Sequence, residues 1–248
     1  MTIPDLSVCV AVYRRHRSPN ISTLAASLDA AVGDRSWELV VTLNGIGAAH
    51  AGVPAFARTV GFDDNRGVPI AWNAAAREAT GRLLCIINDD VVLGPASLAM
   101  LADALDSHPG AGVVGPVGTI WDIAAAQHDS YVDTSALAPG HVARCDVLSG
   151  FLLMTHGDVF SAVGGFDEAL TPCGFEEVDY CTAVRRVAGR DVLVVAGVPV
   201  EHRFAISSQR GLRRIGRFRR ISYMGRTERL DTIAQRNRAH FLSKWGAH

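Results

Sequence analysis

The segment Arg82-Leu83-Leu84-Cys85-Ile86-Ile87-Asn88-Asp89-Asp90 carries the clearest signal of the fold class. Its first six residues form an almost continuous apolar run, which is typical of a strand covered on both faces in an α/β protein. The polar triplet Asn88-Asp89-Asp90 follows at the carboxyl end of this strand. Ligands bind at that end of the strands in open α/β sheets, so this stretch predicts both the fold class and a site.

Strand and helix patterns alternate on both sides of this stretch. Apolar runs predict strands at 6–12, 37–43, near 57–60 and from 113, and helical spacing predicts helices at 20–31, 68–79 and 95–105. Further on, we expect a loop-rich excursion at 122–139, a strand at 147–154 broken by Ser149-Gly150, a helix at 175–188 and a strand at 191–195. The alternation predicts a Rossmann-like α/β fold with a mainly parallel central sheet.

The composition fits one folded domain with an extension. The chain has 248 residues, of which 48% are hydrophobic and 20% charged. No apolar run approaches the roughly 20 residues that cross a bilayer, and the start Met1-Thr2-Ile3-Pro4-Asp5 lacks the features of a secretion signal. Five cysteines without a CxxC spacing favour reduced thiols rather than a zinc site. We therefore expect a cytoplasmic protein.

The charge is divided unevenly along the chain. Residues 203–248 contain twelve Lys and Arg against two acids, so the remaining 202 residues are acidic. We treat 1–202 as the main domain and 203–248 as a basic extension of one or two helices interrupted by Gly211 and Gly216. Packing on the acidic body or a homodimer contact is one interpretation. Contact with anionic lipid at the inner face of the membrane, or with a phosphorylated acceptor, is another. No nucleic-acid motif accompanies the charge.

The triplet Asn88-Asp89-Asp90 has two interpretations. Adjacent carboxylates beside a carboxamide are hard oxygen ligands, which suit Mg²⁺ or Mn²⁺ holding a diphosphate. Asn and Asp also favour turns at strand ends, and the triplet alone does not decide between the two.

A second acidic cluster is Glu176-Glu177-Val178-Asp179. The helix dipole alone would favour acids at this helix start. Three acids in four residues also repel one another, which raises the pKa of at least one and suits a general base. Glu176 and Asp179 share a helix face, whereas Glu177 points elsewhere. His202 follows an apolar run, and a lone histidine is more often structural than a ligand.

Five segments in order resemble one known family, the inverting glycosyltransferases of family 2, which have the GT-A fold. They are Ala11-Val12-Tyr13-Arg14; Asn65-Arg66-Gly67 with Ala71-Trp72-Asn73; Asn88-Asp89-Asp90; Ser149-Gly150-Phe151-Leu152-Leu153-Met154; and Gly164-Gly165-Phe166-Asp167-Glu168 followed by Phe175-Glu176-Glu177-Val178-Asp179-Tyr180-Cys181.

This resemblance implies metal-assisted, inverting transfer of a hexose or deoxyhexose from a nucleotide-sugar donor to an acceptor hydroxyl of a glycan, a lipid-linked molecule or a small molecule. Glu177 would be the base, with Glu176 and Asp179 as accompanying acids. Asp90 and His202 would bind the metal. The donor would lie against Ala11, Tyr13, Asn44, Arg66, Gly67, Asn73, Asn88 and Asp89.

Three positions depart from the family pattern. Asn88 replaces the first Asp of the metal motif, Leu43 stands where an Asp often contacts the nucleotide, and Glu177 replaces the usual Asp. At the second position, the candidate substitutes are Asn44, Asp63 and Asp64, and a different nucleotide base is the alternative. Asn88 and Leu43 keep open a catalytically degenerate scaffold. A sugar nucleotidyltransferase is less favoured, because residues 11–15 contain no glycine.

Overall fold

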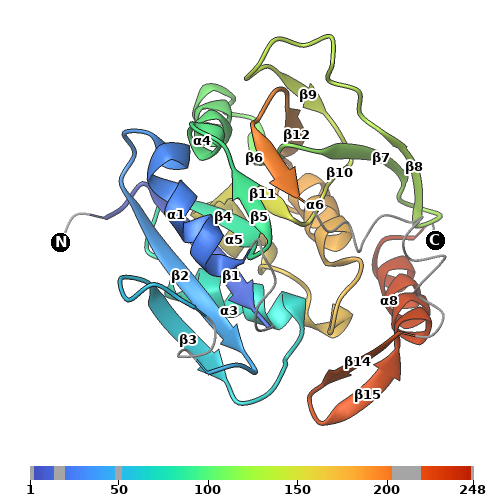
Figure 1. The fold of residues 1–248 in the computed structure, drawn as a ribbon. Helices are drawn as coiled ribbons and strands as arrows, with labels where there is room; N and C mark the ends of the chain where they lie inside the picture. Colours follow the sequence, from blue (N-terminus) through green and yellow to red (C-terminus); the bar gives the residue numbers. More distant parts are fainter. Residues whose placement is uncertain (1–2, 14–19, 48–51, 203–218, 247–248) are drawn as a thin grey trace.

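The computed structural model describes residues 3–13, 20–47, 52–202 and 219–246. Its central sheet has eight strands in the order β3-β2-β1-β4-β11-β6-β12-β9 (Figure 1). The parallel half contains β1 (Leu6–Val12), β2 (Trp37–Asn44), β3 (Arg58–Phe62) and β4 (Leu83–Asn88). The other half contains β11 (Leu152–His156), β6 (Ala111–Gly115), β12 (Asp191–Val195) and β9 (Val142–Arg144).

The strand β11 reverses the direction of the sheet. It runs antiparallel to both β4 and β6, whereas β6 and β12 are parallel to each other. The predicted break at Ser149-Gly150 is confirmed, because β10 (Val147–Leu148) ends just before it and β11 begins just after it. The predicted α/β class with a mainly parallel sheet is therefore confirmed.

Helices cover both faces of the sheet. The helices α1 (Ile21–Val32) and α4 (Ser97–Ser107) pack on one hydrophobic core. The helices α3 (Val68–Glu78), α5 (Gly157–Val163) and α6 (Glu176–Arg186) pack on the other. On β1, Val8 and Val10 face the first core while Cys9 faces the second, as expected for a strand with two buried faces.

The predicted helix ends are only partly correct. Asn20 caps α1, since its Oδ1 accepts hydrogen bonds from the backbone N–H groups of Ser22 and Thr23 at 3.0 and 3.4 Å. The expectation that Pro95 lies in the first turn of α4 is wrong, because this helix begins at Ser97. Ala96 before it has a left-handed backbone with φ 58°, which excludes it from the helix.

The segment 122–139 is more regular than expected. Within it, β8 (Gln127–Tyr131) pairs with β7 (Gly118–Asp122), and β7 also pairs with β10 in a three-stranded sheet. The residues of β8 are mostly exposed, so they lack the apolar alternation by which a half-buried strand is recognised.

The described part of the basic extension is only partly helical. The strands β14 (Arg220–Tyr223) and β15 (Arg226–Arg229) form a hairpin, which the expectation of helices missed, and α8 (Leu230–Trp245) follows. Met224 and Gly225 both have positive φ, so they form the two-residue turn. The predicted interruptions at Gly211 and Gly216 lie outside the described residues.

The extension packs on the main domain. Phe241 of α8 is fully buried and belongs to the second core. The hairpin attaches to the loop after β3, where the Asn65 side chain donates to the Ser222 carbonyl at 2.8 Å. These contacts support the packing interpretation of the basic extension. Within the described ranges, no helix is both long and apolar enough to cross a bilayer.

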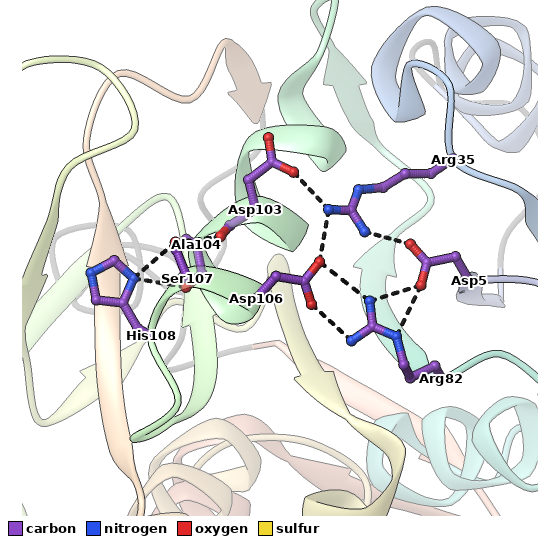
Figure 2. A network of polar contacts seen from close by, with 8 residues as sticks. All are labelled: Asp5, Arg35, Arg82, Asp103, Ala104, Asp106, Ser107 and His108. Atoms are coloured by element: carbon purple, nitrogen blue, oxygen red, sulfur yellow. Dashed lines mark hydrogen bonds and ion pairs between the residues drawn. The ribbon is translucent and has the colours of Figure 1, made fainter.

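A network of charged side chains joins elements at the amino ends of β1, β2 and β4 (Figure 2). Arg82 binds Asp5 and Asp106 at 2.8 Å each, and Arg35 binds Asp103 at 2.6 Å and Asp106 at 2.8 Å. Arg35 also pairs with Asp5. The network fastens α4 to the sheet at the edge opposite Asn88, so it leaves the carboxyl edge free for a site.

Candidate active site

The metal candidates lie where the chain leaves the main sheet. Asn88 is the last residue of β4, and its backbone N–H donates to the Phe151 carbonyl at 2.9 Å. The short strand β5 (Val91–Leu93) then pairs with β13 (Val200–His202) in antiparallel register, with His202 opposite Val91. This pairing places His202 Nε2 3.2 Å from Asp90 Oδ1.

The surroundings of this pair restrict its motion. The side chain of His202 is only 11% exposed and that of Asp90 23%. The ring of Phe151 stacks on the His202 imidazole, with centroids 4.6 Å apart and an interplanar angle of 11°. Burial, and then the negative charge of Asp90, raise the pKa of Asp89 to about 7. A cation at this position would favour the ionised form of Asp89.

The donor atoms of Asp90 and His202 suit a cation that is bound partly by the protein and partly by a ligand. Among the residues that the structure describes, no group of three or more His, Cys, Asp or Glu side chains is placed to hold a metal ion. Asp90 and His202 offer one carboxylate and one imidazole. Mg²⁺ in proteins is commonly bound by one or two carboxylates, with substrate phosphates and water completing its shell. The pair therefore fits an open site rather than a closed protein cage.

The second acidic cluster begins α6, and its entry is strained. Phe175 precedes the helix with φ 75°, a left-handed conformation that is unfavourable for a bulky residue, and it supplies no side-chain cap. Its ring packs against Trp121 and Phe241, at centroid distances of 6.1 and 5.5 Å. Such strain persists where the surrounding packing enforces it, and it is common at functional sites.

Glu176 and Glu177 have different surroundings. Glu176 is 8% exposed, and its Oε2 is buried without a hydrogen-bond partner. Burial, and then the charge of Glu177, raise the pKa of Glu176 to about 8, so Glu176 is largely protonated at neutral pH. Burial also raises the pKa of Glu177. Glu177 is half-buried and is therefore the more accessible of the two.

Two residues, Gly150 and Phe151, connect the acidic clusters. A Cβ atom on Gly150 would lie 3.4 Å from the Cβ of Glu177 and 3.5 Å from its Cδ, so the Glu177 side chain rests against the backbone at Gly150. The next residue, Phe151, bonds to the Asn88 backbone and stacks on His202. Both clusters therefore surround one turn between β10 and β11.

Asp179 is directed toward the C-terminal helix. Its carboxylate is 2% exposed and accepts hydrogen bonds from Lys244 Nζ at 2.9 Å and from Trp245 Nε1 at 2.6 Å. Both donors lie in the last turn of α8. These contacts occupy both oxygens of Asp179, which supports a role in fastening α8 to α6.

Three of the predicted donor-binding residues support loops. Asn44 Oδ1 accepts a hydrogen bond from the Arg66 backbone N–H at 2.7 Å, and Asn44 Nδ2 donates one to Asn65 Oδ1 at 3.0 Å. Asn73 accepts the Phe166 N–H at 2.9 Å and donates to the Phe166 carbonyl at 2.8 Å. A Cβ on Gly67 would lie 2.7 Å from Pro172 Cα, so glycine permits the close approach of the two loops.

The remaining donor candidates line the carboxyl edge of the sheet. Ala11 is half-buried and lies opposite Asn88 in the β1–β4 register. Tyr13 follows β1 and is 38% exposed. Arg66 pairs with Asp64 at 2.5 Å and leaves 42% of its side chain exposed. Tyr13 and Arg66, unlike Asn44 and Asn73, expose their side chains at this edge.

Several residues that shape this site carry little signal in the sequence. Gly150 and Phe151 lie in a segment that predicts a strand, and only the break in its apolar run at Ser149-Gly150 points to them. Asn237, Lys244 and Trp245 lie on α8, and no local pattern relates this helix to α6.

The first half of the chain matches a known protein family. Residues 7–122 match the family model described as "Glycosyl transferase family 2". The protein described as "Uncharacterized protein y4gI", from Sinorhizobium fredii (strain NBRC 101917 / NGR234), is 28% identical over an alignment of 141 residues, and the match covers 48% of this chain and 15% of that protein.

Two solved structures share the fold. GalNAc-T7 with UDP, GalNAc and Mn²⁺ has a TM-score of 0.63 at 14% identity, over 81% of this chain and 44% of that chain. The mannosyltransferase PcManGT from Pyrobaculum calidifontis, in complex with GDP-Man and Mn²⁺, has a TM-score of 0.52 at 19% identity, over 79% of this chain and 57% of that chain. This chain thus spans less than two thirds of each relative.

The fold is that of the GT-A glycosyltransferases. The resemblance inferred from the sequence motifs is confirmed over residues 7–122, which match the model of this family.

Proposed function

We propose that this chain transfers a sugar from a nucleoside-diphosphate donor to an acceptor hydroxyl. One observation carries this proposal. The turn at Gly150-Phe151 contacts Glu177 on one side and both Asn88 and His202 on the other, so a base and a cation-binding pair surround one small region. The two solved structures with this fold contain nucleotides or a nucleotide sugar with Mn²⁺, which supports the same class of donor here.

Asp90 and His202 would hold Mg²⁺ or Mn²⁺, with Asn88 and Asp89 beside them. When bound there, the cation would neutralise charge on the donor diphosphate as it leaves. Asn88 carries no charge, so the triplet Asn88-Asp89-Asp90 has one carboxylate fewer than a triplet with Asp at both its first and its third position. The imidazole of His202 supplies a second donor atom in its place.

Glu177 would act as the general base. The acceptor oxygen loses its proton to the Glu177 carboxylate as it bonds to the anomeric carbon, and the bond from that carbon to the diphosphate oxygen breaks. Attack from the face opposite the diphosphate inverts the anomeric configuration. Glu176 is protonated at neutral pH and does not compete for this proton, and the burial that raises the pKa of Glu177 makes it a stronger base.

Tyr13 and Arg66 would contact the nucleotide, because they expose side chains at the same sheet edge. Asn44, Gly67 and Asn73 would shape this pocket through the loops that they hold. We also propose that the transferred sugar is a hexose or a deoxyhexose. The acceptor would be a glycan, a lipid-linked molecule or a small molecule.

Two wider expectations also belong to this proposal. The five cysteines all carry free thiols, which supports a reducing, cytoplasmic location. The division at residue 202 into a GT-A domain and a basic extension stays a prediction, as do contact of the extension with a membrane and a homodimer.

Calorimetry with UDP, GDP and dTDP, each with and without Mn²⁺, tests donor binding. We expect one nucleotide to bind, and to bind more tightly with the metal. Turnover of the matching nucleotide sugar then tests the base: Glu177→Gln should lower kcat by about 10²–10⁴-fold while nucleotide binding persists. The control is Glu78→Gln, which changes an exposed glutamate on α3. Near-normal turnover by folded Glu177→Gln would show that another residue is the base.

A further inference from the structure

We propose that Asn237 of α8 is a positioning residue for the catalytic glutamates, acting through the backbone of the loop that precedes them. The inference rests on the proposed function, because that proposal assigns the base to Glu177. It assigns to the C-terminal helix α8 a role in positioning the residues of the site.

Asn237 binds a single loop at three points. The residue is fully buried. Its Nδ2 lies 2.5 Å from the Leu170 carbonyl oxygen and 3.0 Å from each of the carbonyl oxygens of Cys173 and Gly174. An amide nitrogen has two hydrogens, so at least one of them is shared between two carbonyls. A buried amide that is satisfied in this way fixes the path of residues 170–174.

This loop needs support from outside. It ends in two residues with positive φ, Gly174 at 96° and Phe175 at 75°, immediately before Glu176. The first turn of α6 has no side-chain cap of its own. The direction in which α6 begins, and thus the position of the Glu176 and Glu177 side chains, therefore depends on what holds the carbonyls of this loop.

Neighbouring residues of α8 contact the same region. Arg236 donates to the Thr171 carbonyl at 2.5 Å, and Phe241, one turn after Asn237, packs on Phe175. One further turn on, Lys244 and Trp245 bind Asp179. One face of α8 thus follows the loop and the first turn of α6, and Asn237 supplies the hydrogen bonds nearest the strained residues.

Asn237 acts through the loop rather than on the reaction itself. The hydrogen bonds that its Nδ2 donates go to backbone carbonyls of the loop, and none of these carbonyls belongs to Glu176 or Glu177. Removing its amide would leave those carbonyls without this donor and would let the strained entry to α6 relax. A displacement of about 1 Å at a catalytic group can lower the rate about 100-fold, so the expected effect is on kcat.

Cys173 provides a measurement that does not depend on activity. It is half-buried, whereas the other four cysteines are buried, and its carbonyl accepts a hydrogen bond from Asn237. Burial, and then the charges of Glu176 and Glu177, raise the pKa of its thiol to about 12, so the wild-type thiol should react slowly at pH 8. Loosening of the loop should speed this reaction.

The test compares Asn237→Ala with Ile233→Ala. Ile233 is a matched control, because it lies one turn earlier on α8, is fully buried and has an aliphatic side chain that cannot bond to the loop. For Asn237→Ala we expect kcat to fall about 10–100-fold with the donor KM changed by less than about twofold. Modification of Cys173 by a thiol reagent should become several-fold faster. Ile233→Ala should lower the melting temperature and keep both values near those of the wild type.

Equal loss of kcat in the two variants, or a loss confined to KM, would overturn the inference. If Asn237→Ala does not fold, Asn237→Gln takes its place, since it keeps the amide one methylene farther out; wild-type kcat in that variant would argue against positioning. A wild-type protein that transfers no sugar would instead refute the proposed function. The rate of Cys173 modification would then decide by itself whether Asn237 holds the loop.

Discussion

His202 Nε2 lies 3.2 Å from Asp90 Oδ1, although 112 positions separate the two residues in the chain. The short pairing of β5 with β13 produces this contact, and the stacked ring of Phe151 fixes the imidazole plane. Two isolated residues thereby become a pair of donor atoms beside Asn88 and Asp89.

Replacing His202 by alanine should weaken metal-dependent nucleotide binding. One of the two proposed protein ligands is lost, and we expect the affinity in the presence of Mn²⁺ to fall at least about tenfold, while the weaker metal-free binding stays the same. Calorimetry measures both. His108→Ala is the control, because His108 bonds to the Ala104 carbonyl on α4, away from the site. Unchanged affinity with Mn²⁺ would remove His202 from the metal site.

Replacing Gly150 by alanine should lower turnover with little effect on folding. The added Cβ would lie 3.4 Å from the Cβ of Glu177 and 3.5 Å from its Cδ, so it would be in direct contact with the Glu177 side chain and would restrict its position. We expect kcat to fall about tenfold or more. Gly61→Ala is the matched control, since its Cβ would meet only the Leu43 Cβ at 3.8 Å. Equal activity of the two variants would show that the position of Glu177 at Gly150 has no catalytic importance.

Stability should depend on Glu176 in the neutral to alkaline range. Burial, and then the charge of Glu177, raise the pKa of Glu176 from 4.5 to about 8, so the folded state holds a proton that the unfolded state releases. This contribution is fully present below about pH 4.5 and is lost as the pH rises toward 8. Glu176→Gln should therefore raise the melting temperature at pH 8 by a few degrees and leave it almost unchanged at pH 4.5. Thermal denaturation across this pH range measures the effect, with Glu78→Gln as the control. If Glu176→Gln changed the melting temperature equally at pH 4.5 and pH 8, the raised pKa would not belong to Glu176.

The network around Asp106 predicts the opposite pH dependence (Figure 2). Partial burial opposes ionisation of Asp106, but hydrogen bonds from Arg82 and Arg35 outweigh it and lower the pKa of its carboxyl below 3.8. Its contribution is present above that pH and is lost as the pH falls through the lowered pKa.

Because the groups of this network are partly exposed, Asp106→Asn should cost only about 1 kcal/mol at pH 7. The loss should shrink in 1 M salt, where the Debye length is about 3 Å. Denaturant titration measures it. Turnover should persist, because the network lies at the edge opposite Asn88. Asp103→Asn, at a side chain that is 70% exposed, should cost less. A cost that is insensitive to salt would contradict the electrostatic origin.

Much of the fold could be predicted from local patterns. The apolar run before Asn88 identified the central strand β4, and the break at Ser149-Gly150 marked the start of β11. Local patterns failed at β8, whose residues are mostly exposed, and at the hairpin β14–β15, whose basic composition resembles that of a polar helix.

Local sequence patterns were enough to predict the α/β class and the acids at the end of β4 and the start of α6, because buried strands and helix starts leave a pattern within a few residues. They could not predict which of these groups meet, which depends on tertiary contacts. The tertiary structure brought His202 to Asp90, placed Glu177 against Gly150 and directed Asp179 to Lys244. Strand pairing and helix packing join residues far apart in the chain, and such contacts leave no periodic signal in either segment.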